Sequence, residues 1–344
     1  MRHLHIMKSE KFVPDVIKTI NDNFYCGHTF LVFDGTNVNS EKNVRVLSSK
    51  SFSDIILSLR YMVKAEKVYF HGLFVHTLVV SCSLFKKILK KSTWILWGND
   101  LYAYRERNDS LLKSIYEFFR AGFIKNVGTI AVSMDGEFRL AKAWYNTNAT
   151  HFKGFTYPSV TVSEYISEAP QNPRDEDIVK KILVGNSATR SNNHIDVFNY
   201  INNNFLFDYE VICPLSYGCN DYADKVEREG EKILGDKFFS LRKMMPMDEY
   251  IKMLDSVDIA IFDMERQQAM GNIIQLLAMG KVVCIRSSTS TYEHLCEMGV
   301  EVFTKEQISR CDSIPDCTGN IEIVRNGYSK EQLVINLSEL FSNE

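Results

Sequence analysis

The stretch VDIAIFDMERQQAMGNIIQLLAMGKVVCI, residues 257–285, combines two apolar runs with a segment of helical period. VDIAIF (257–262) and KVVCI (281–285) are short and rich in Val and Ile, which is typical of strands buried on both faces. Residues 268–279 between them follow a helical period, and Gly280 suits the position just after a helix end. A strand, a helix and a strand in this order predict one unit of a parallel sheet.

The same alternation runs through most of the chain. The apolar runs LHIM, TFLVFD, KVYFH, TWILW and TIAVS occur in the first half, and KILVG and YEVICP occur in the second half ahead of the opening stretch. Further helices are predicted at 52–65, 75–90, 107–124, 192–204 and 246–255. A last helix is predicted after Ser329, which suits an N-cap that Gln332 completes as a capping box. We therefore predict an α/β fold with two Rossmann-like, doubly wound parallel-sheet domains facing a cleft.

The length of 344 residues suits two domains of roughly 150 residues each. The segment SEYISEAPQNPRDEDIVK (163–180) is rich in acids, amides and Pro, as exposed linkers are, and it predicts a hinge near 165–178. We accordingly expect one domain at 1–165 and a second at 179–325. A C-terminal helix within 326–344 is expected to pack back toward the first domain.

Composition excludes several classes of protein. Hydrophobic residues make up 45% and charged residues 24% of the chain, and the formal net charge of -3 does not fit a protein that coats nucleic acid. The N-terminus lacks the apolar run of a signal peptide, and no stretch approaches the roughly 20 apolar residues of a membrane span. The eight cysteines are irregularly spaced without a CxxC pair, so we expect reduced thiols and a cytosolic compartment.

Polar residues follow the strands of the second half, where ligands bind in parallel α/β sheets. NSATRSNNH (186–194) offers backbone N–H groups, a helix start and Arg190, which together suit a phosphate. The alternative is a well-capped turn. Tyr217 in CPLSYG and the turn MMPMDEY (244–250) could each bind a nucleotide base or be simple turns.

The polar cluster Glu265–Gln268 opens the helix of the first quoted stretch. Gly271 and Asn272 in its first turn would let a ligand approach the backbone, and Arg266 adds a full charge to the positive helix end. The cluster therefore predicts a receptor for a diphosphate and a sugar. The alternative is a solvated loop with its acid and base paired, although the adjacent amides Gln267 and Gln268 give such a loop no obvious advantage.

Two strand ends of the first half are also polar. YFHGLFVHT (69–77) places His71 and Gly72 at one end, and WILWGNDLY (94–102) holds Trp97, Gly98, Asn99, Asp100 and Tyr102 at another. Asp100 or His71 could act as a general base on a hydroxyl group, and either could instead be structural. The chain has neither an HxxxH pattern nor a clean DxD, so we expect no metal ion and no cofactor.

A basic and apolar segment lies between those two strand ends. SLFKKILKKSTW (83–94) alternates apolar residues with Lys86, Lys87, Lys90 and Lys91. Together with LLKSIYEFFRAGFIKN (111–126), it predicts a surface suited to anionic lipid headgroups. The alternative is an ordinary amphipathic helix with solvated lysines.

Taken together, these motifs resemble a known family. HGLF, WGNDLY, LVGNSATRSNNHI, CPLSYG and ERQQAMGNIIQLLAMG are similar, in order and spacing, to the TDP-4-acetamido-4,6-dideoxygalactose (N-acetylfucosamine) transferases, the 4-alpha-L-fucosyltransferase type of glycosyltransferase. The likeness spans most of the chain. Its most specific parts are WG-x-DLY, VGNS-x-x-RSN-x-HI and RQQ-x-x-G.

The resemblance implies a GT-B glycosyltransferase of enterobacterial common antigen or O-antigen synthesis. Such an enzyme is peripheral on the cytoplasmic face of the inner membrane and moves an acetamido-dideoxyhexose from a dTDP-sugar to a polyprenyl-diphosphate-linked saccharide. The first domain would then face acceptor and membrane, and the second would bind the donor. The motif matches imply donor binding by Gly185, Asn186, Ser187, Arg190, Arg266, Gln267, Gln268 and Gly271, and the positions of Tyr217 and Asn272 after strands add these two to the predicted donor site. The motif matches imply an acceptor side with Gly72, Trp97, Gly98 and Tyr102, to which the strand-end position adds Asn99.

One departure leaves the stereochemistry open. Many retaining GT-B enzymes have two glutamates around this glycine-rich turn, and the second would fall at Gln275, which has no carboxylate. A base-assisted direct displacement is the mechanism we expect. The sequence leaves open a non-catalytic module that binds nucleotide sugars or polysaccharide. A dinucleotide-dependent epimerase or dehydrogenase is disfavoured, because GxGxxG does not follow the first strand.

Overall fold

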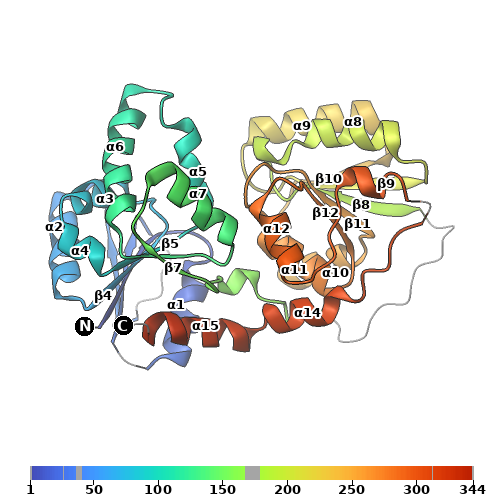
Figure 1. Ribbon diagram of the computed structural model, residues 1–344. Helices are drawn as coiled ribbons and strands as arrows, with labels where there is room; N and C mark the ends of the chain where they lie inside the picture. Colours follow the sequence, from blue (N-terminus) through green and yellow to red (C-terminus); the bar gives the residue numbers. More distant parts are fainter. Residues whose placement is uncertain (1, 26, 36–40, 167–178, 312, 343–344) are drawn as a thin grey trace. The chain divides into compact units, whose positions relative to one another are not determined.

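The computed structural model describes residues 2–25, 27–35, 41–166, 179–311 and 313–342 (Figure 1). The chain divides into two compact units. Unit 1 comprises Met1–Ser159 together with Leu333–Glu344, and unit 2 comprises Val160–Gln332. Residues 167–178, which make up most of the predicted hinge, lie outside the described residues. The two parallel-sheet α/β domains predicted from the sequence are confirmed.

Unit 1 contains a seven-stranded parallel sheet with the order β3-β2-β1-β4-β5-β6-β7. Its strands are β1 (His3–Lys8), β2 (His28–Phe33), β3 (Val44–Leu47), β4 (Lys67–His71), β5 (Ser92–Ile95), β6 (Thr129–Ala131) and β7 (Thr150–Phe152). The central strands are buried on both faces because helices cover the sheet, which explains their continuous apolar sequences. The edge strands β3 and β7 are more exposed, and the sequence pattern did not predict them.

The helices of unit 1 are α1 (Val13–Asn23), α2 (Phe52–Lys64), α3 (His76–Ser83), α4 (Lys86–Lys90), α5 (Asn99–Tyr102), α6 (Leu111–Asn126) and α7 (Asp135–Tyr145). The prediction of one helix over 75–90 is wrong. The chain leaves the helical conformation at Phe85 (φ -114°, ψ 76°), so α3 and α4 are separate. The helix predicted at 107–124 begins at Leu111, because the Ser110 side chain accepts a hydrogen bond from the Lys113 backbone N–H and caps it there.

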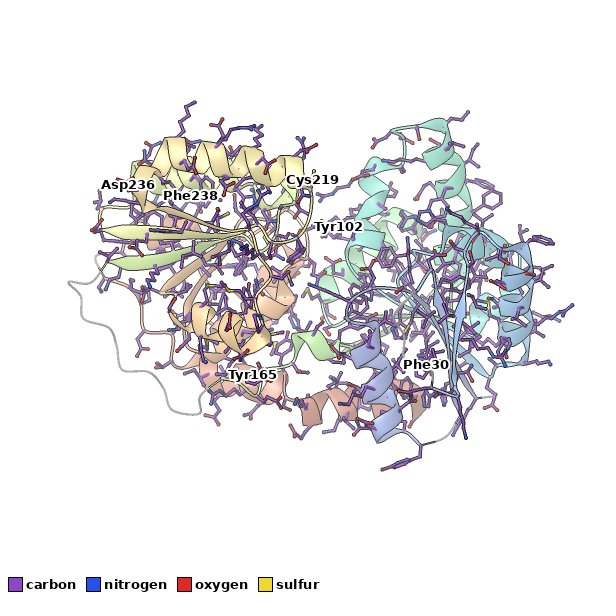
Figure 2. All side chains as sticks on the ribbon, turned by 180° about the vertical axis from the view of Figure 1, so that it is seen from behind. Phe30, Tyr102, Tyr165, Cys219, Asp236 and Phe238 are labelled. Carbon is purple, nitrogen blue, oxygen red and sulfur yellow. The ribbon has the colours of Figure 1, made fainter. Side chains whose placement is uncertain are left out.

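Unit 2 contains a five-stranded parallel sheet with the order β10-β9-β8-β11-β12. Its strands are β8 (Lys180–Val184), β9 (Tyr209–Pro214), β10 (Phe238–Leu241), β11 (Ile259–Phe262) and β12 (Val282–Ile285). β10 is again an edge strand that the pattern missed. Figure 2 shows the side chains of both units, including Phe30 in the sheet of unit 1 and Phe238 on β10.

The helices of unit 2 are α8 (His194–Asn204), α9 (Asn220–Leu234), α10 (Met247–Asp255), α11 (Met270–Ala278), α12 (Ser290–Glu297), α13 (Lys305–Ile308) and α14 (Asn320–Gly327). The last helix, α15 (Lys330–Ser342), starts in unit 2 and ends in unit 1. The Ser329 hydroxyl accepts a hydrogen bond from the Gln332 backbone N–H (3.0 Å), as predicted for an N-cap. In unit 1, Leu337 and Phe341 of α15 are buried.

Candidate functional site

Two predicted donor loops meet in unit 2. β8 and β11 are hydrogen-bonded neighbours in the parallel sheet, so the loops that follow them both start at the carboxyl end of the strands. Gln268 joins the two loops. Its Nε2 donates to Asn186 Oδ1 (3.1 Å) and Thr189 Oγ1 (3.2 Å), and its Oε1 accepts from the Ser191 hydroxyl (2.7 Å). The structure therefore brings together residues that are about 80 positions apart in the sequence.

A third loop, after β9, adds Tyr217. The Tyr217 hydroxyl accepts a hydrogen bond from Asn186 Nδ2 (2.7 Å), and the residue is 43% exposed. Partial burial raises the pKa of Tyr217, whose hydroxyl is protonated at neutral pH even at the ordinary value of about 10. One edge of the sheet therefore presents amide and hydroxyl groups from three loops, together with the exposed Arg190 of the first loop.

Gly185 is required by the close packing beneath the first loop. Its φ is +70°, and a Cβ there would lie 2.7 Å from His194 Nε2 and 3.0 Å from Asn192 Oδ1. Asn192 holds the loop by donating from Nδ2 to the Ser187 carbonyl (2.9 Å). His194 is fully buried, and burial lowers its pKa to about 4. The helix predicted to start at 192 begins two residues later, because Asn193 is left-handed (φ 53°) and α8 begins at His194.

The second loop enters α11 through Ala269, which has a left-handed backbone (φ 62°) and caps the helix without a side-chain hydrogen bond. The first-turn N–H groups of α11 therefore have no side-chain cap among the described residues, an arrangement suited to an anion. Arg266 is partly exposed in this loop. Asn272, predicted as a donor ligand, has its amide bonded to the Tyr250 hydroxyl (2.8 Å) and so connects α11 to α10.

Charged residues that the sequence analysis missed anchor the same loop. Arg286 donates to both Asp263 oxygens (3.2 and 2.9 Å) and lies 3.4 Å from Glu265, while Lys305 Nζ lies 3.0 Å from Asp263. Asp263, Arg286 and Lys305 line a hollow of about 310 Å³ at the ends of β11 and β12. Arg286 directly follows the strand β12, so the rule of searching strand ends could have found it.

Gln275 connects α11 to the segment that begins unit 2. Its Oε1 accepts from the Ser163 backbone N–H (2.8 Å), and its Nε2 donates to the Thr161 carbonyl (2.8 Å). Gln275 is buried. An amide serves both partners at once because it contains a donor and an acceptor, whereas a carboxylate only accepts. The absence of a glutamate at this position thus has a structural reason.

In unit 1, Asp100 lies in the interior with both carboxylate oxygens occupied. Oδ2 accepts from the Trp94 indole N–H (2.6 Å) and the Leu73 N–H (3.2 Å). Oδ1 accepts from the backbone N–H groups of Trp97 (3.0 Å) and Leu101 (3.1 Å). Burial raises the pKa of Asp100, although the donors oppose the shift. These contacts fix the predicted acceptor loop, and Asp100 could act as a base only after leaving them.

His71 belongs to a buried chain of hydrogen bonds. Trp97 Nε1 donates to the Tyr157 hydroxyl, which lies 3.2 Å from His71 Nδ1, and His71 Nε2 lies 3.0 Å from His5 Nδ1. His5 Nε2 lies 2.9 Å from His28 Nδ1. Burial lowers the pKa of His71 to about 3, so the ring is neutral at pH 7. The indole N–H of Trp97 can only donate, so the Tyr157 hydroxyl accepts this bond and donates its own proton to His71 Nδ1. His71 then carries its proton on Nε2 and donates it to His5 Nδ1. His5 in turn carries its proton on Nε2 and donates it to His28 Nδ1.

The remaining acceptor-side residues lie in or next to the loop after β5 that contains Asp100. Gly72 (φ 75°) and Gly98 (φ 77°) occupy left-handed turns at the ends of β4 and β5. Asn99 is exposed, while Tyr102, labelled in Figure 2, is buried and donates its hydroxyl to Glu137 Oε1 (3.0 Å). The structure thus brings these residues together within unit 1.

The predicted lysine surface is only partly accessible. Lys86, Lys87 and Lys90 are exposed on α4. Lys91 turns back, and its Nζ donates to the carbonyls of Val63 (3.0 Å) and Ala65. Within the described ranges, no cluster of three or more His, Cys, Asp or Glu side chains could hold a metal ion. None of the helices in those ranges is long and apolar enough to cross a bilayer.

Solved structures show the same fold. Sucrose-phosphate synthase from Thermosynechococcus elongatus matches with a TM-score of 0.70 at 11% identity, covering 99% of this chain and 98% of that one. Anabaena HepE, solved with UDP and glucose, gives 0.68 at 10% identity, covering 98% and 99%. WaaG, a glycosyltransferase involved in lipopolysaccharide biosynthesis, gives 0.64 at 11% identity, covering 100% of both chains. These likenesses establish the GT-B glycosyltransferase fold.

The family itself is established by sequence. The family model described as 4-alpha-L-fucosyltransferase, glycosyl transferase group 56, matches residues 17–323. That range includes both donor loops and both acceptor-side loops of the resemblance described above. The chain therefore belongs to the group 56 glycosyltransferases, the 4-alpha-L-fucosyltransferase family.

Proposed function

We propose that this glycosyltransferase moves a 4-acetamido-4,6-dideoxyhexose from a dTDP-sugar to an undecaprenyl-diphosphate-linked saccharide. The reaction would serve the synthesis of common antigen or O-antigen at the cytoplasmic face of the bacterial inner membrane. Support comes from the family to which the chain belongs and from the motifs it shares with N-acetylfucosamine transferases. We also propose that the reaction needs no metal ion, so that activity should survive chelation by EDTA.

The observation that carries the proposal is the junction that Gln268 makes between the loops after β8 and β11. It assembles amide and hydroxyl groups beside the start of α11, and Arg190 and Arg266 add positive charge to the two loops. Such a set suits a nucleoside diphosphate, since charge-assisted contacts and a helix N-terminus both favour phosphate oxygens. HepE has the same fold and was solved with UDP and glucose, which supports a nucleotide-sugar donor here.

The proposed chemistry is a direct displacement at the donor sugar. An acceptor hydroxyl oxygen bonds to the anomeric carbon while the bond from that carbon to the diphosphate oxygen breaks, and the hydroxyl proton passes to a base. Arg190, Arg266 and the start of α11 would stabilise the negative charge that develops on the departing diphosphate. Losing one such contact typically costs about 2–4 kcal/mol of transition-state stabilisation. Asp100 and His71 remain the predicted bases, and either would have to exchange its present partners for the acceptor.

Calorimetric titration with dTDP and UDP tests the donor site. We expect dTDP to bind more tightly than UDP, and Arg266→Ala to weaken binding at least tenfold, because a charge-assisted phosphate contact contributes roughly 1.5–3 kcal/mol. Arg228→Ala is the control, since Arg228 is an exposed arginine of α9 in the same unit. If neither nucleotide binds to the folded protein, or if both variants bind alike, the donor-site proposal fails.

A further inference from the structure

Helix α6 of unit 1 has two apolar faces. One face packs inward with Phe123 and Ile124, as in any amphipathic helix. The other face carries a run of large apolar side chains at helical spacing. These residues are Leu111, Leu112, Ile115 and Phe118, with exposed fractions of 77%, 79%, 49% and 76%. Leu111, Ile115 and Phe118 are four and three residues apart in succession, and Leu112 lies three residues before Ile115, so the four side chains lie on one face of the helix.

The stripe continues onto the connection between α3 and α4. At the break that separates these two helices, Leu84 is 71% exposed and Phe85 is 48% exposed. Leu84 and Phe118 line the same hollow of about 650 Å³, together with Trp144 of α7. We call the six exposed residues of the stripe and the connection the apolar patch. In Figure 1, α6 stands at the edge of unit 1.

The segments that contain the apolar patch have an excess of positive charge. Residues 83–126 contain nine Lys and Arg against four Asp and Glu, in a chain whose formal net charge is -3. Two of the four acids, Glu106 and Asp109, both pair with Lys113. A third, Glu117, pairs with the buried Arg120. Lys125 lines the hollow beside Phe118, and the exposed Lys86 and Lys87 directly follow Phe85.

We infer that the apolar patch inserts into the surface of a bilayer that contains anionic phospholipids, with Lys86, Lys87 and Lys125 at the level of the headgroups. Exposed apolar side chains with lysines beside them are the composition that such a surface binds. A second copy of the chain fits less well, because a symmetric dimer would bring two like-charged patches together. The inference rests on the proposed function only in that a lipid-linked acceptor requires an enzyme at the membrane.

The surface predicted from the sequence combined 83–94 with 111–126, and the apolar patch lies in these two segments. Ile88 and Leu89 of α4 are buried, and Lys91 is bound to carbonyls of unit 1. The short helix α4 therefore presents lysines without an apolar face of its own. The apolar side chains come from α6 and from Leu84 and Phe85. The predicted helix over 75–90 would have included Leu84 and Phe85, but in the structure they lie at the break between α3 and α4.

Vesicle sedimentation of the full chain tests the inference. We expect binding to vesicles of phosphatidylcholine with about 30% phosphatidylglycerol, and at least tenfold weaker binding to phosphatidylcholine alone. Leu112→Ser with Phe118→Ser should reduce binding to the anionic vesicles at least tenfold, since two inserted apolar side chains are lost. Leu206→Ser, at a 96% exposed position of unit 2, is the matched control and should bind like the original chain.

Two results would overturn the inference. One is a failure of the original chain to bind the anionic vesicles, or equal binding by the double variant. The other is a dimer, measured by light scattering, that the double variant dissociates, because a second copy would then cover the patch. The dTDP titration separates this inference from the proposed function. Nucleotide binding without vesicle binding refutes only the membrane surface, and the reverse refutes only the donor site.

Discussion

Replacing Gln275 by glutamate tests why this family member lacks a carboxylate on α11. The two side chains have nearly the same shape, so packing is preserved. Oε1 can still accept from the Ser163 N–H, but the second oxygen of an ionised glutamate would face the Thr161 carbonyl, to which Gln275 now donates at 2.8 Å. One hydrogen bond is lost, and a buried charge is placed against a carbonyl oxygen.

At pH 8, Gln275→Glu should lower the free energy of unfolding by about 3 kcal/mol. This is the usual effect of removing a buried donor and leaving its acceptor against a negative charge. This penalty depends on pH, because a protonated glutamate can donate to Thr161 and accept from Ser163, as the amide does. The folded state therefore raises the pKa of the introduced carboxyl above its ordinary value of about 4.3. The penalty should be complete above about pH 6.5, decline as the pH falls, and vanish below about pH 4.

The assay combines urea denaturation with hydrogen exchange. All three tryptophans (Trp94, Trp97 and Trp144) lie in unit 1, so their fluorescence follows unit 1, while circular dichroism follows both units. At about pH 8 the variant should lose dichroism at lower urea, with the fluorescence midpoint unchanged. The peptide containing Ser163 should exchange faster, and the difference should shrink at about pH 5. Equal stability of the two proteins at the higher pH, or a penalty that grows as the pH falls, would refute the reasoning.

Three further perturbations probe other parts of the structure. Asp100→Asn should lower the free energy of unfolding of unit 1 by about 2–4 kcal/mol, because an amide leaves only one oxygen for four N–H donors. An unchanged urea midpoint in tryptophan fluorescence would contradict this expectation. Burial lowers the pKa of His3 and His28 to about 4, below the unfolded value of about 6.5, so the unfolded chain binds more protons between these values. Stability should therefore be highest above about pH 6.5 and fall toward about pH 4 by up to about 1.4 kcal/mol per pH unit for each histidine, as urea midpoints measured across this range would reveal. Gly185→Ala should destabilise unit 2 by about 2–4 kcal/mol and weaken dTDP binding, whereas Gly299→Ala, also at positive φ but with open space around its Cβ, should cost only about 1–2 kcal/mol in thermal unfolding.

The central strands of both sheets were predictable because their residues are buried on both faces. Runs such as KILVG and VDIAIF have no polar alternation, and a strand covered by helices needs none. The strands that escaped prediction, β3, β7 and β10, are all at sheet edges. Each is short and partly exposed, so its sequence contains polar residues and no continuous apolar run. Local pattern therefore identified the fully buried strands, including the edge strand β12, and missed the other three edge strands.

The candidate donor site was predictable in outline for a similar reason. In a parallel sheet, chain direction alone puts every strand-end loop at one edge, so polar residues after β8, β9 and β11 were expected to lie together. The individual partners were not predictable. Gln268 bonds to Asn186 and Ser191, while Asn272 bonds to Tyr250 instead of facing the loops. These pairings depend on how strands and helices pack, which local sequence does not encode.

The sequence by itself determined the α/β class, the two parallel sheets and the family, because burial pattern and motif spacing are local properties of the chain. Only the tertiary structure decided which polar side chains lie on the surface and which are enclosed. Asp100 and His71 look like catalytic residues in the sequence, yet both are buried and occupied by protein partners. Lys91 looks like a surface lysine in the sequence, yet its Nζ donates to the backbone carbonyls of Val63 and Ala65. Exposure depends on what packs against a residue, and those neighbours come from distant parts of the chain.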